Sequence, residues 1–242
     1  KLSSPCIYYM KKLVLLFCII ITSCVNSSTH SKHAFFKGTF LKIEKRVIIT
    51  VCNPKNHNQC ITREYNSSAS SFLIKNKKDK SYLLTAGHVC KTDYGSLIFL
   101  PKFQAKEEFY GLNFKMQKFR YKVHSIDQKS DLCIVTADRI GTKPYKIAKS
   151  YPALGDVVYN IAAPLGIFEK NIIPLFTGRF GGSAYGRTLF TLPAVGGSSG
   201  SPILNKRGQV IGLVSAVTIR FNQVVISPTL EQIRKVIEDA EL

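Results

Sequence analysis

The chain has 242 residues, 45% of them hydrophobic and 20% charged, with 34 Lys+Arg against 15 Asp+Glu and a formal net charge of +19. This length suits one large all-β unit or two small domains, and the composition excludes a disordered or collagen-like chain. The charge is dispersed, with no long block of like charges, which suits either an anionic partner or simply a lysine-rich surface.

Residues 1–23 are predicted to be a leader and not part of the fold. The short basic segment Met10-Lys11-Lys12 precedes an apolar run over residues 13–21. That run is too short for a membrane span of about 20 residues and is typical of a signal peptide. We expect Met10 to be the start, with residues 1–9 lying upstream, and we expect the protein to be exported to the periplasm or the cell surface.

The leader ends in Ile21-Thr22-Ser23-Cys24, which is similar to a bacterial lipobox. Lipidation of Cys24 would attach the protein to a membrane. The alternative is ordinary cleavage near Ser23, with Cys24 incidental. Residues 25–31 are mostly polar, and residues 24–35 are predicted to form a flexible tether.

From about Phe35 onward, short β-rich runs alternate with turn residues, as in a sandwich or barrel. These runs cover residues 47–51, 71–74, 82–85, 97–100, 132–135, 157–161, 187–190, 210–214 and 224–226. No long helices alternate with them, so a parallel α/β sheet is not expected. Glycine and proline near residues 140–152 suggest a boundary that divides the folded part, 36–242, into about 36–145 and about 146–242.

One helix is predicted, at the C-terminus. Apolar residues recur there at helical spacing: Leu230, Ile233, Val236, Ile237 and Ala240. Thr229 and Gln232 fit a capping box at its start. The apolar stripe is expected to dock on the body of the protein.

Three segments carry residues suited to nucleophilic catalysis. His88 follows an apolar strand and an Ala-Gly turn, Asp131 opens an apolar strand, and Ser199 lies in a glycine-rich turn. A serine nucleophile needs a base to take its proton and an acid to orient that base. These three residue types therefore predict a catalytic triad.

Chain order separates the candidate folds. Residues 196–200 match a G-x-S-x-G elbow, but that fold needs its histidine after the serine, and the last histidine here is His124. A subtilisin order would need an acid such as Asp79 before the histidine, and the flanking β pattern does not suit that α/β fold. The order histidine, aspartate, serine is that of chymotrypsin-type barrels.

The segments around the triad resemble a known family. Thr85-Ala86-Gly87-His88 is similar to the family's T-A-A-H, and Asp131-Leu132 to its acid segment. Gly197-Ser198-Ser199-Gly200-Ser201-Pro202 is similar to its nucleophile motif, and residues 205–215 to the run that follows. Over about residues 36–242 the chain thus resembles a trypsin-like serine peptidase of the bacterial or phage type.

The resemblance implies an all-β fold of two antiparallel six-stranded barrels with a C-terminal α-helix. It implies a serine endopeptidase in which Ser199 is the nucleophile, His88 the general base and Asp131 the orienting acid. The N–H groups of Gly197 and Ser199 would form the oxyanion hole. The substrate would be a protein or peptide, with no cofactor and no metal, and no nucleic-acid partner is expected. The alternative is an inactive barrel that acts as a surface binding protein.

The resemblance also implies a substrate pocket with Pro193 at its floor and Ser215, Ala216 and Val217 on its wall. Members specific for Lys or Arg carry an acid where this chain has Pro193, so that specificity is not expected. Val217 replaces the glycine of open pockets and favours small or medium aliphatic residues. Arg220 leaves an acidic preference open.

The folded part holds four cysteines, which permit three disulfide connectivities: Cys52, Cys60, Cys90 and Cys133. In a working triad the histidine and the aspartate touch, and Cys90 and Cys133 each lie two residues after them. The resemblance therefore predicts a Cys90–Cys133 disulfide between the catalytic segments, which leaves Cys52 and Cys60 to pair.

Other residues of the same types are expected to lie outside the site. His124 is in a polar stretch near Asp127 and is predicted to be a surface residue. His57 is expected in a loop. Ser198 and Ser201 are expected to be turn residues.

Overall fold

The structure, a computed structural model, describes residues 40–53, 59–100, 102–218 and 221–242. Contacts divide the chain into two compact units, residues 1–35 and 36–242, and all described residues belong to the second. The predicted leader, the tether and the lipidation of Cys24 lie outside the described residues. Within the described ranges no helix has the length and apolar character needed to cross a membrane.

Seven antiparallel strands form the first sheet, in the order β5-β4-β1-β2-β3-β7-β6. Their bounds are β1 Phe40–Cys52, β2 Cys60–Lys77, β3 Lys80–Ala86, β4 Gln104–Leu112, β5 Lys118–Arg120, β6 Lys122–Asp127 and β7 Leu132–Asp138. Buried side chains such as Leu41, Leu83 and Val135 form its core. The sheet curls, so that β5 contacts β7 across the core.

The second sheet also has seven antiparallel strands, in the order β12-β11-β8-β9-β10-β14-β13. Their bounds are β8 Val157–Ile161, β9 Leu175–Ala184, β10 Arg187–Thr191, β11 Pro202–Leu204, β12 Val210–Leu213, β13 Ala216–Thr218 and β14 Phe221–Ser227. Its edge strands β12 and β13 are separated only by Val214 and Ser215. This short connection brings the two edges of the sheet together as it curls around a core that includes Phe190 and Ile211.

The predicted fold class is confirmed, with seven strands in each sheet instead of the expected six. The short edge strands β5 and β13 have three residues each, too few to show an alternating pattern in the sequence. The first sheet ends at Asp138 and the second begins at Val157. The suggested boundary near residues 140–152 falls between these positions.

The predicted strand at residues 97–100 is wrong. Gly95–Phe99 forms a 3-10 helix, η2, in which the side chains of Ile98 and Phe99 are 53% and 83% exposed. The N–H of Gly95 donates to Asp93 Oδ1 at 2.8 Å, and Gly95 has a φ of 52°. This Asx turn at Asp93 directs the chain into the 3-10 helix, so the apolar run does not extend as a strand.

The C-terminal helix is confirmed as α3, Leu230–Asp239, and it begins with the expected capping box. The N–H of Gln232 donates to Thr229 Oγ1 at 3.2 Å, and the N–H of Thr229 donates to Gln232 Oε1 at 2.7 Å. Leu230, Ile233 and Val236 are its buried side chains. They lie on one face, because residues three or four apart in a helix share a face.

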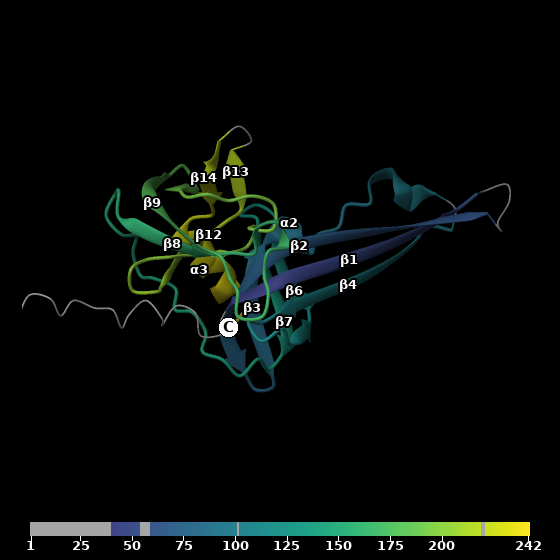
Figure 1. The fold of residues 1–242 in the computed structure, drawn as a ribbon, viewed down its shortest axis with the longest axis horizontal. Helices are drawn as coiled ribbons and strands as arrows, with labels where there is room; N and C mark the ends of the chain where they lie inside the picture. Colours follow the sequence, from purple (N-terminus) through teal and green to yellow (C-terminus); the bar gives the residue numbers. More distant parts are fainter. Residues whose placement is uncertain (1–39, 54–58, 101, 219–220) are drawn as a thin grey trace, which may run out of the picture. The chain divides into compact units, whose positions relative to one another are not determined.

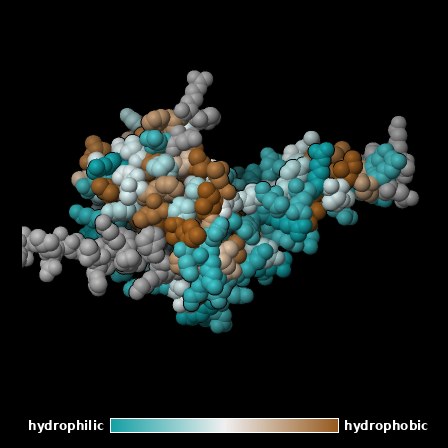
Figure 2. Space-filling model, in the orientation of Figure 1, coloured by the Kyte–Doolittle hydropathy of each residue, from teal (hydrophilic) through white to brown (hydrophobic). Residues whose placement is uncertain are grey.

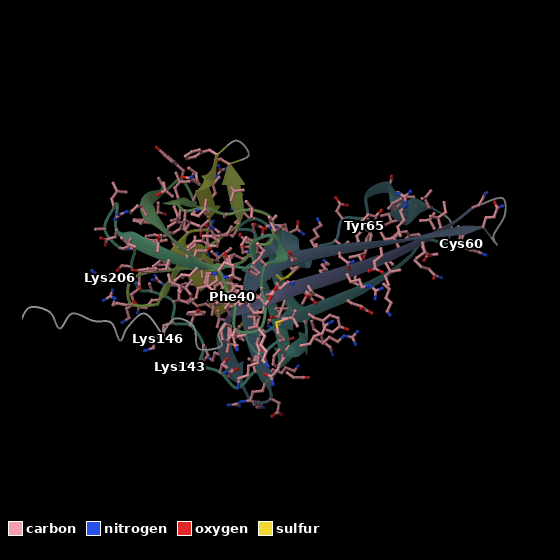
Figure 3. The ribbon with its side chains drawn as sticks, viewed as in Figure 1. Phe40, Cys60, Tyr65, Lys143, Lys146 and Lys206 are labelled. Carbon is pink, nitrogen blue, oxygen red and sulfur yellow. A yellow bond between two sulfur atoms is a disulfide. The ribbon has the colours of Figure 1, made fainter. Side chains whose placement is uncertain are left out.

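Strands β1, β2 and β4 continue beyond the rest of the first sheet as an arm (Figure 1). The β1–β2 pair runs from Phe40↔Phe72 out to Cys52↔Cys60, whereas β3 pairs with β2 only from Phe72 onward. A disulfide joins Cys52 to Cys60 at the end of the arm, where Figure 3 labels Cys60. Residues 60–67 of β2 are all exposed, and Figure 2 shows both polar and apolar residues toward this end.

Candidate active site

His88 lies just after β3, on the short helix α2, Gly87–Cys90. Its Nδ1 is 3.1 Å from Oδ1 and 3.0 Å from Oδ2 of Asp131, and its backbone N–H donates to Oδ1 at 2.8 Å. The N–H of Gly87 donates to the Asp131 carbonyl at 2.9 Å. The turn after β3 therefore holds the aspartate with its backbone as well as with the imidazole. The His88 side chain is 51% exposed, which leaves the ring open to a substrate.

Asp131 directly precedes β7, and its φ of 51° is unusual for a residue other than glycine. Its Oδ2 also accepts a hydrogen bond from the Ser215 hydroxyl. Burial raises the pKa of Asp131, but hydrogen bonds from the His88 ring, the Ser215 hydroxyl and the His88 N–H outweigh it and hold the pKa below its usual range. The carboxylate is therefore ionised at neutral pH and can keep a proton on His88 Nδ1.

Ser199 lies in the turn between β10 and β11. Each carbonyl group of residues 196–199 accepts a hydrogen bond, and the N–H groups of Ser198 and Gly200 donate to other backbone carbonyls. In the part of the chain that the structure describes, the N–H groups of Gly197 and Ser199 have no acceptor. These are the two N–H groups that the resemblance assigns to an oxyanion hole.

Gly197 adopts a conformation that suits glycine alone. Its φ is 91°, and a Cβ at this position would lie 2.3 Å from the carbonyl oxygen of Ala163. A side chain here would have to displace the backbone that borders the turn. The glycine of the nucleophile motif is therefore required both by its dihedral angle and by the space around it.

Ser199 and His88 line the same cavity, which has a volume of about 330 Å³. Among the described residues no hydrogen bond joins the Ser199 hydroxyl to His88. Such contacts are often long in unbound enzymes and shorten when substrate binds. The structure thus pairs His88 with Asp131 and brings Ser199 to the same cavity without bonding it to the imidazole.

A second cavity, of about 550 Å³, lies against β1, β2 and β4. The two cavities share Lys45, Ser67 and Ser68, and Leu165 and Gly166 border the second one. Its charged lining contains both signs: Lys42, Glu44, Lys45, Arg46, Glu108 and Lys118. The second cavity is therefore strongly polar. Its lining residues Lys42, Glu44 and Arg46 alternate along β1 with Ile43 and Val47 of the first cavity, so most of it lies on the other face of the strand from Ser199.

Of the predicted pocket residues, Pro193 lies in the segment that leads to Ser199, Ser215 directly precedes β13, and Ala216 and Val217 are on β13. Pro193 and Ala216 are exposed, and Val217 packs against the second core. Their contact with substrate stays a prediction. Ser215, expected on the pocket wall, also donates its hydroxyl to Asp131. That role was missed, although the serine ends the run over residues 205–215 that resembles the family.

Ser70 is a second residue of the site that was missed. It is fully buried on β2, and its N–H donates to the Ser199 carbonyl at 2.8 Å. In the sequence it is one of several small polar residues before an apolar run, and nothing local distinguishes it from a residue of the sheet. The partners of its N–H and of its hydroxyl lie in segments next to the strands of the second sheet.

The other candidate residues do not join the site. His124 lies exposed on β6, as predicted, with its ring edge-on to Tyr82 at 5.4 Å between ring centroids. Asp127 Oδ1 accepts hydrogen bonds from the N–H groups of Lys129 and Ser130 and so closes a turn. His57 lies outside the described residues.

A disulfide joins Cys90 on α2 to Cys133 on β7, the pair that the resemblance predicted, with their Cα atoms 6.4 Å apart. Both cysteines are buried in the first core. The bond ties the segment that carries His88 to the strand that follows Asp131. The remaining pair, Cys52 and Cys60, forms the disulfide of the arm.

Removal of the Cys90–Cys133 disulfide, by changing both cysteines to alanine, is expected to lower the free energy of unfolding by about 3–4 kcal/mol. The two cysteines are 43 residues apart in the sequence, so the bond restricts a large loop of the unfolded chain. Urea unfolding followed by fluorescence measures the change. The matched control removes Cys52 and Cys60, which are separated by only 8 residues and should contribute about 2–3 kcal/mol. A larger loss in the control would contradict the loop-closure argument.

Comparisons with known proteins agree with this geometry. A family model described as a trypsin-like peptidase domain matches residues 69–213. A serine endoprotease from Yersinia pestis has a similar structure, with a TM-score of 0.58 and 16% identity, over 80% of this chain and 62% of that protein. This chain thus spans less than two thirds of the Yersinia protein.

A Mycobacterium tuberculosis protein, crystallised as a serine-to-alanine mutant in an inactive form, is also similar. The TM-score is 0.55 and the identity 16%, over 81% of this chain and 86% of that protein. At this identity both structures show a shared fold. Among the curated proteins none matches this chain.

Proposed function

Because this chain belongs to the trypsin-like peptidase domain family, we propose that it is an exported serine endopeptidase that works through an acyl-enzyme on Ser199. The observation that carries the proposal is the contact of Asp131 with His88 Nδ1 in the cavity that also holds Ser199. Nucleophile, base and orienting acid are the three groups that acyl transfer from a peptide needs.

In the acylation step the Ser199 oxygen attacks the carbonyl carbon of the scissile peptide, and its proton passes to Nε2 of His88. The negative oxygen that results accepts hydrogen bonds from the free N–H groups of Gly197 and Ser199. Asp131 stays ionised and stabilises the imidazolium. The carbon–nitrogen bond then breaks as His88 gives its proton to the departing amine.

In the deacylation step a water molecule replaces the amine. His88 takes a proton from the water as its oxygen attacks the acyl carbon, and the same two N–H groups receive the negative charge. The bond to Ser199 then breaks, and the serine oxygen recovers the proton from His88. The products are a free carboxylic acid and the original enzyme.

Export is supported by the two disulfides, because such bonds form and persist in oxidising compartments. The leader predicted over residues 1–23 agrees with a periplasmic or cell-surface location. Lipidation of Cys24 would hold the enzyme at a membrane through the polar tether. Mass spectrometry of the purified protein would show a diacylglyceryl group on Cys24 if this anchor forms.

Covalent labelling with a fluorophosphonate probe tests the proposed activity. We expect the wild-type protein to be labelled at Ser199, because an activated serine attacks phosphorus as it attacks a carbonyl carbon. Ser199→Ala should abolish labelling. The control Ser183→Ala should keep it, because Ser183 lies on β9 and its hydroxyl bonds, among the described residues, to Arg187 and Thr188. A folded wild-type protein that takes no label would favour the alternative, an inactive barrel that binds without cutting.

A peptide-library cleavage profile is expected to favour small or medium aliphatic residues before the scissile bond. The reasons are that Pro193 supplies no carboxylate for Lys or Arg and that Val217 narrows the pocket. We expect a preference over basic residues of about 10-fold or more in kcat/KM. Val217→Gly should raise cleavage after larger side chains. A profile dominated by Lys or Arg would contradict the predicted aliphatic preference. Arg220, which left an acidic preference open, lies outside the described residues.

A further inference from the structure

Ser70 contacts the turn that carries Ser199 with both its backbone and its side chain. Its N–H donates to the Ser199 carbonyl at 2.8 Å. Its Oγ donates to the Gly197 carbonyl at 2.9 Å and accepts from the N–H of Ala163 at 3.2 Å. Its own carbonyl accepts from Thr85 Oγ1 at 2.8 Å. Every polar group of this buried residue is engaged, and three of the four contacts reach the segments that precede or connect the strands of the second sheet.

The two carbonyls that Ser70 holds belong to the two residues whose N–H groups are free. Gly197 and Ser199 are each restrained at the carbonyl side, while their N–H groups face no acceptor among the described residues. Gly197 has no Cβ, so no side chain of its own restricts its φ and ψ. The Gly197 N–H lies in one peptide plane with the Gly196 carbonyl, which accepts a hydrogen bond from the Leu165 N–H at 2.7 Å. The Ser70 hydroxyl holds the next plane at the Gly197 carbonyl, so the two bonds together limit rotation about the Gly197 φ and ψ.

We propose that the Ser70 hydroxyl is a positioning group for the oxyanion hole. It acts through the Gly197 carbonyl and does not touch the substrate. The inference rests on the proposed function, because it requires the Gly197 N–H to receive the developing negative charge. Fixed donors stabilise that charge best when neighbouring hydrogen bonds hold them in place before the reaction.

The fold supplies a matched control in the adjacent residue. Ser71 is also fully buried, and its Oγ donates to the Leu41 carbonyl at 3.2 Å and lies 2.9 Å from the Tyr121 hydroxyl. These partners belong to the first sheet and not to the turn around Ser199. Ser70→Ala and Ser71→Ala therefore remove the same group from similar surroundings, and the difference between them reports the contact with the turn.

The two variants are compared in kcat and KM for a peptide substrate and in inhibition by a peptide boronic acid. The tetrahedral boronate formed on Ser199 directs an oxygen at the oxyanion hole. We expect Ser70→Ala to lower kcat about 10- to 100-fold, less than the roughly 100- to 1,000-fold cost of losing a donor. Boronate affinity should fall by a similar factor while KM changes less than about threefold. Ser71→Ala should stay near wild type in both.

The pH profile adds a readout that separates this role from a general loss of structure. Ser70 contacts neither His88 nor Asp131, so the acid limb of kcat/KM should keep its wild-type midpoint in Ser70→Ala. Equal losses in the two variants, or a loss confined to KM, would overturn the assignment. If Ser70→Ala does not fold, Ser70→Thr is compared with Ser70→Val, since threonine and valine have nearly the same shape and differ in the hydroxyl. Higher activity with threonine supports the role of the hydroxyl, and equal activity rejects it.

Failure of this inference can be told apart from failure of the proposed function. If the wild-type protein takes no fluorophosphonate label, the proposed peptidase function is rejected. If the wild-type protein is labelled but the Ser70→Ala and Ser71→Ala variants behave alike, only the proposed role of Ser70 is rejected.

Discussion

Replacing His88 with alanine is expected to lower kcat for peptide hydrolysis by about six orders of magnitude. Without the imidazole, Ser199 keeps its proton and the departing amine receives none. Among the histidines that the structure describes, His88 is the one whose ring contacts an aspartate, Asp131, as a general base of this kind requires. Turnover of a quenched fluorescent peptide measures the loss, with circular dichroism to show that the variant is folded.

The matched control is His124→Ala. His124 is exposed on β6 and contacts the ring of Tyr82, and we expect its loss to leave kcat within about twofold of wild type, as for most surface changes. A His88→Ala protein that keeps more than about 1% of wild-type kcat would reject His88 as the base. A large loss of kcat in His124→Ala would mean that His88 had been wrongly chosen over His124 as the base.

Replacing Asp131 with asparagine is expected to lower kcat about 10,000-fold. The carboxylate accepts the Nδ1 proton of His88 and stabilises the imidazolium, and it is held in place by the backbone N–H of His88 and the hydroxyl of Ser215. An asparagine amide is neutral and can offer a donor to Nδ1, which favours the wrong tautomer of the base. Steady-state kinetics at neutral pH measure the effect.

Asp127→Asn is the control for this variant. Asp127 accepts hydrogen bonds from the N–H groups of Lys129 and Ser130, and an asparagine oxygen can accept the same bonds. We expect kcat to stay close to wild type. A comparable loss in Asp127→Asn would show that the loop before β7, and not the triad carboxylate, limits the rate.

The pH dependence of unfolding offers a second measurement on Asp131. Its pKa is held below its usual range in the folded protein, so the carboxylate stabilises the fold above its unfolded pKa of about 3.9. That stabilisation is lost as the pH falls through the lower, folded-state pKa. The wild-type free energy of unfolding should therefore fall more steeply on acidification than that of Asp131→Asn. Equal slopes would mean that the folded protein does not stabilise the ionised form of this carboxylate.

The proposed catalytic residues could be picked out because short motifs mark them. His88, Asp131 and Ser199 each sit where an apolar strand meets a turn, and their chain order excludes competing folds. The Cys90–Cys133 disulfide followed from the contact that the triad itself requires. These predictions needed no knowledge of how distant strands pair.

Contacts made between distant segments could not be predicted. Ser70 and Ser215 act through partners that lie far away in the chain, and serine is common in strands and turns alike. The outer part of β2 carries polar side chains on both faces, so its residues 60–67 show no strand pattern. The apolar run at residues 97–100 has the composition of a strand, but an Asx turn between Asp93 and Gly95 leads into a 3-10 helix instead.

The cross-link at the end of the arm sets the alignment of a strand that continues into the active site. β1 and β2 pair without interruption from Cys52↔Cys60 to the rows beside Ser70, which lies opposite Lys42. Slippage by one residue would swap the two faces of β2 and turn the Ser70 hydroxyl away from Gly197. The outer half of β2 has no buried face to resist such a slip, and the covalent bond supplies the resistance there. A solvent-exposed hairpin thereby fixes the register that places the Ser70 hydroxyl against the turn of Ser199.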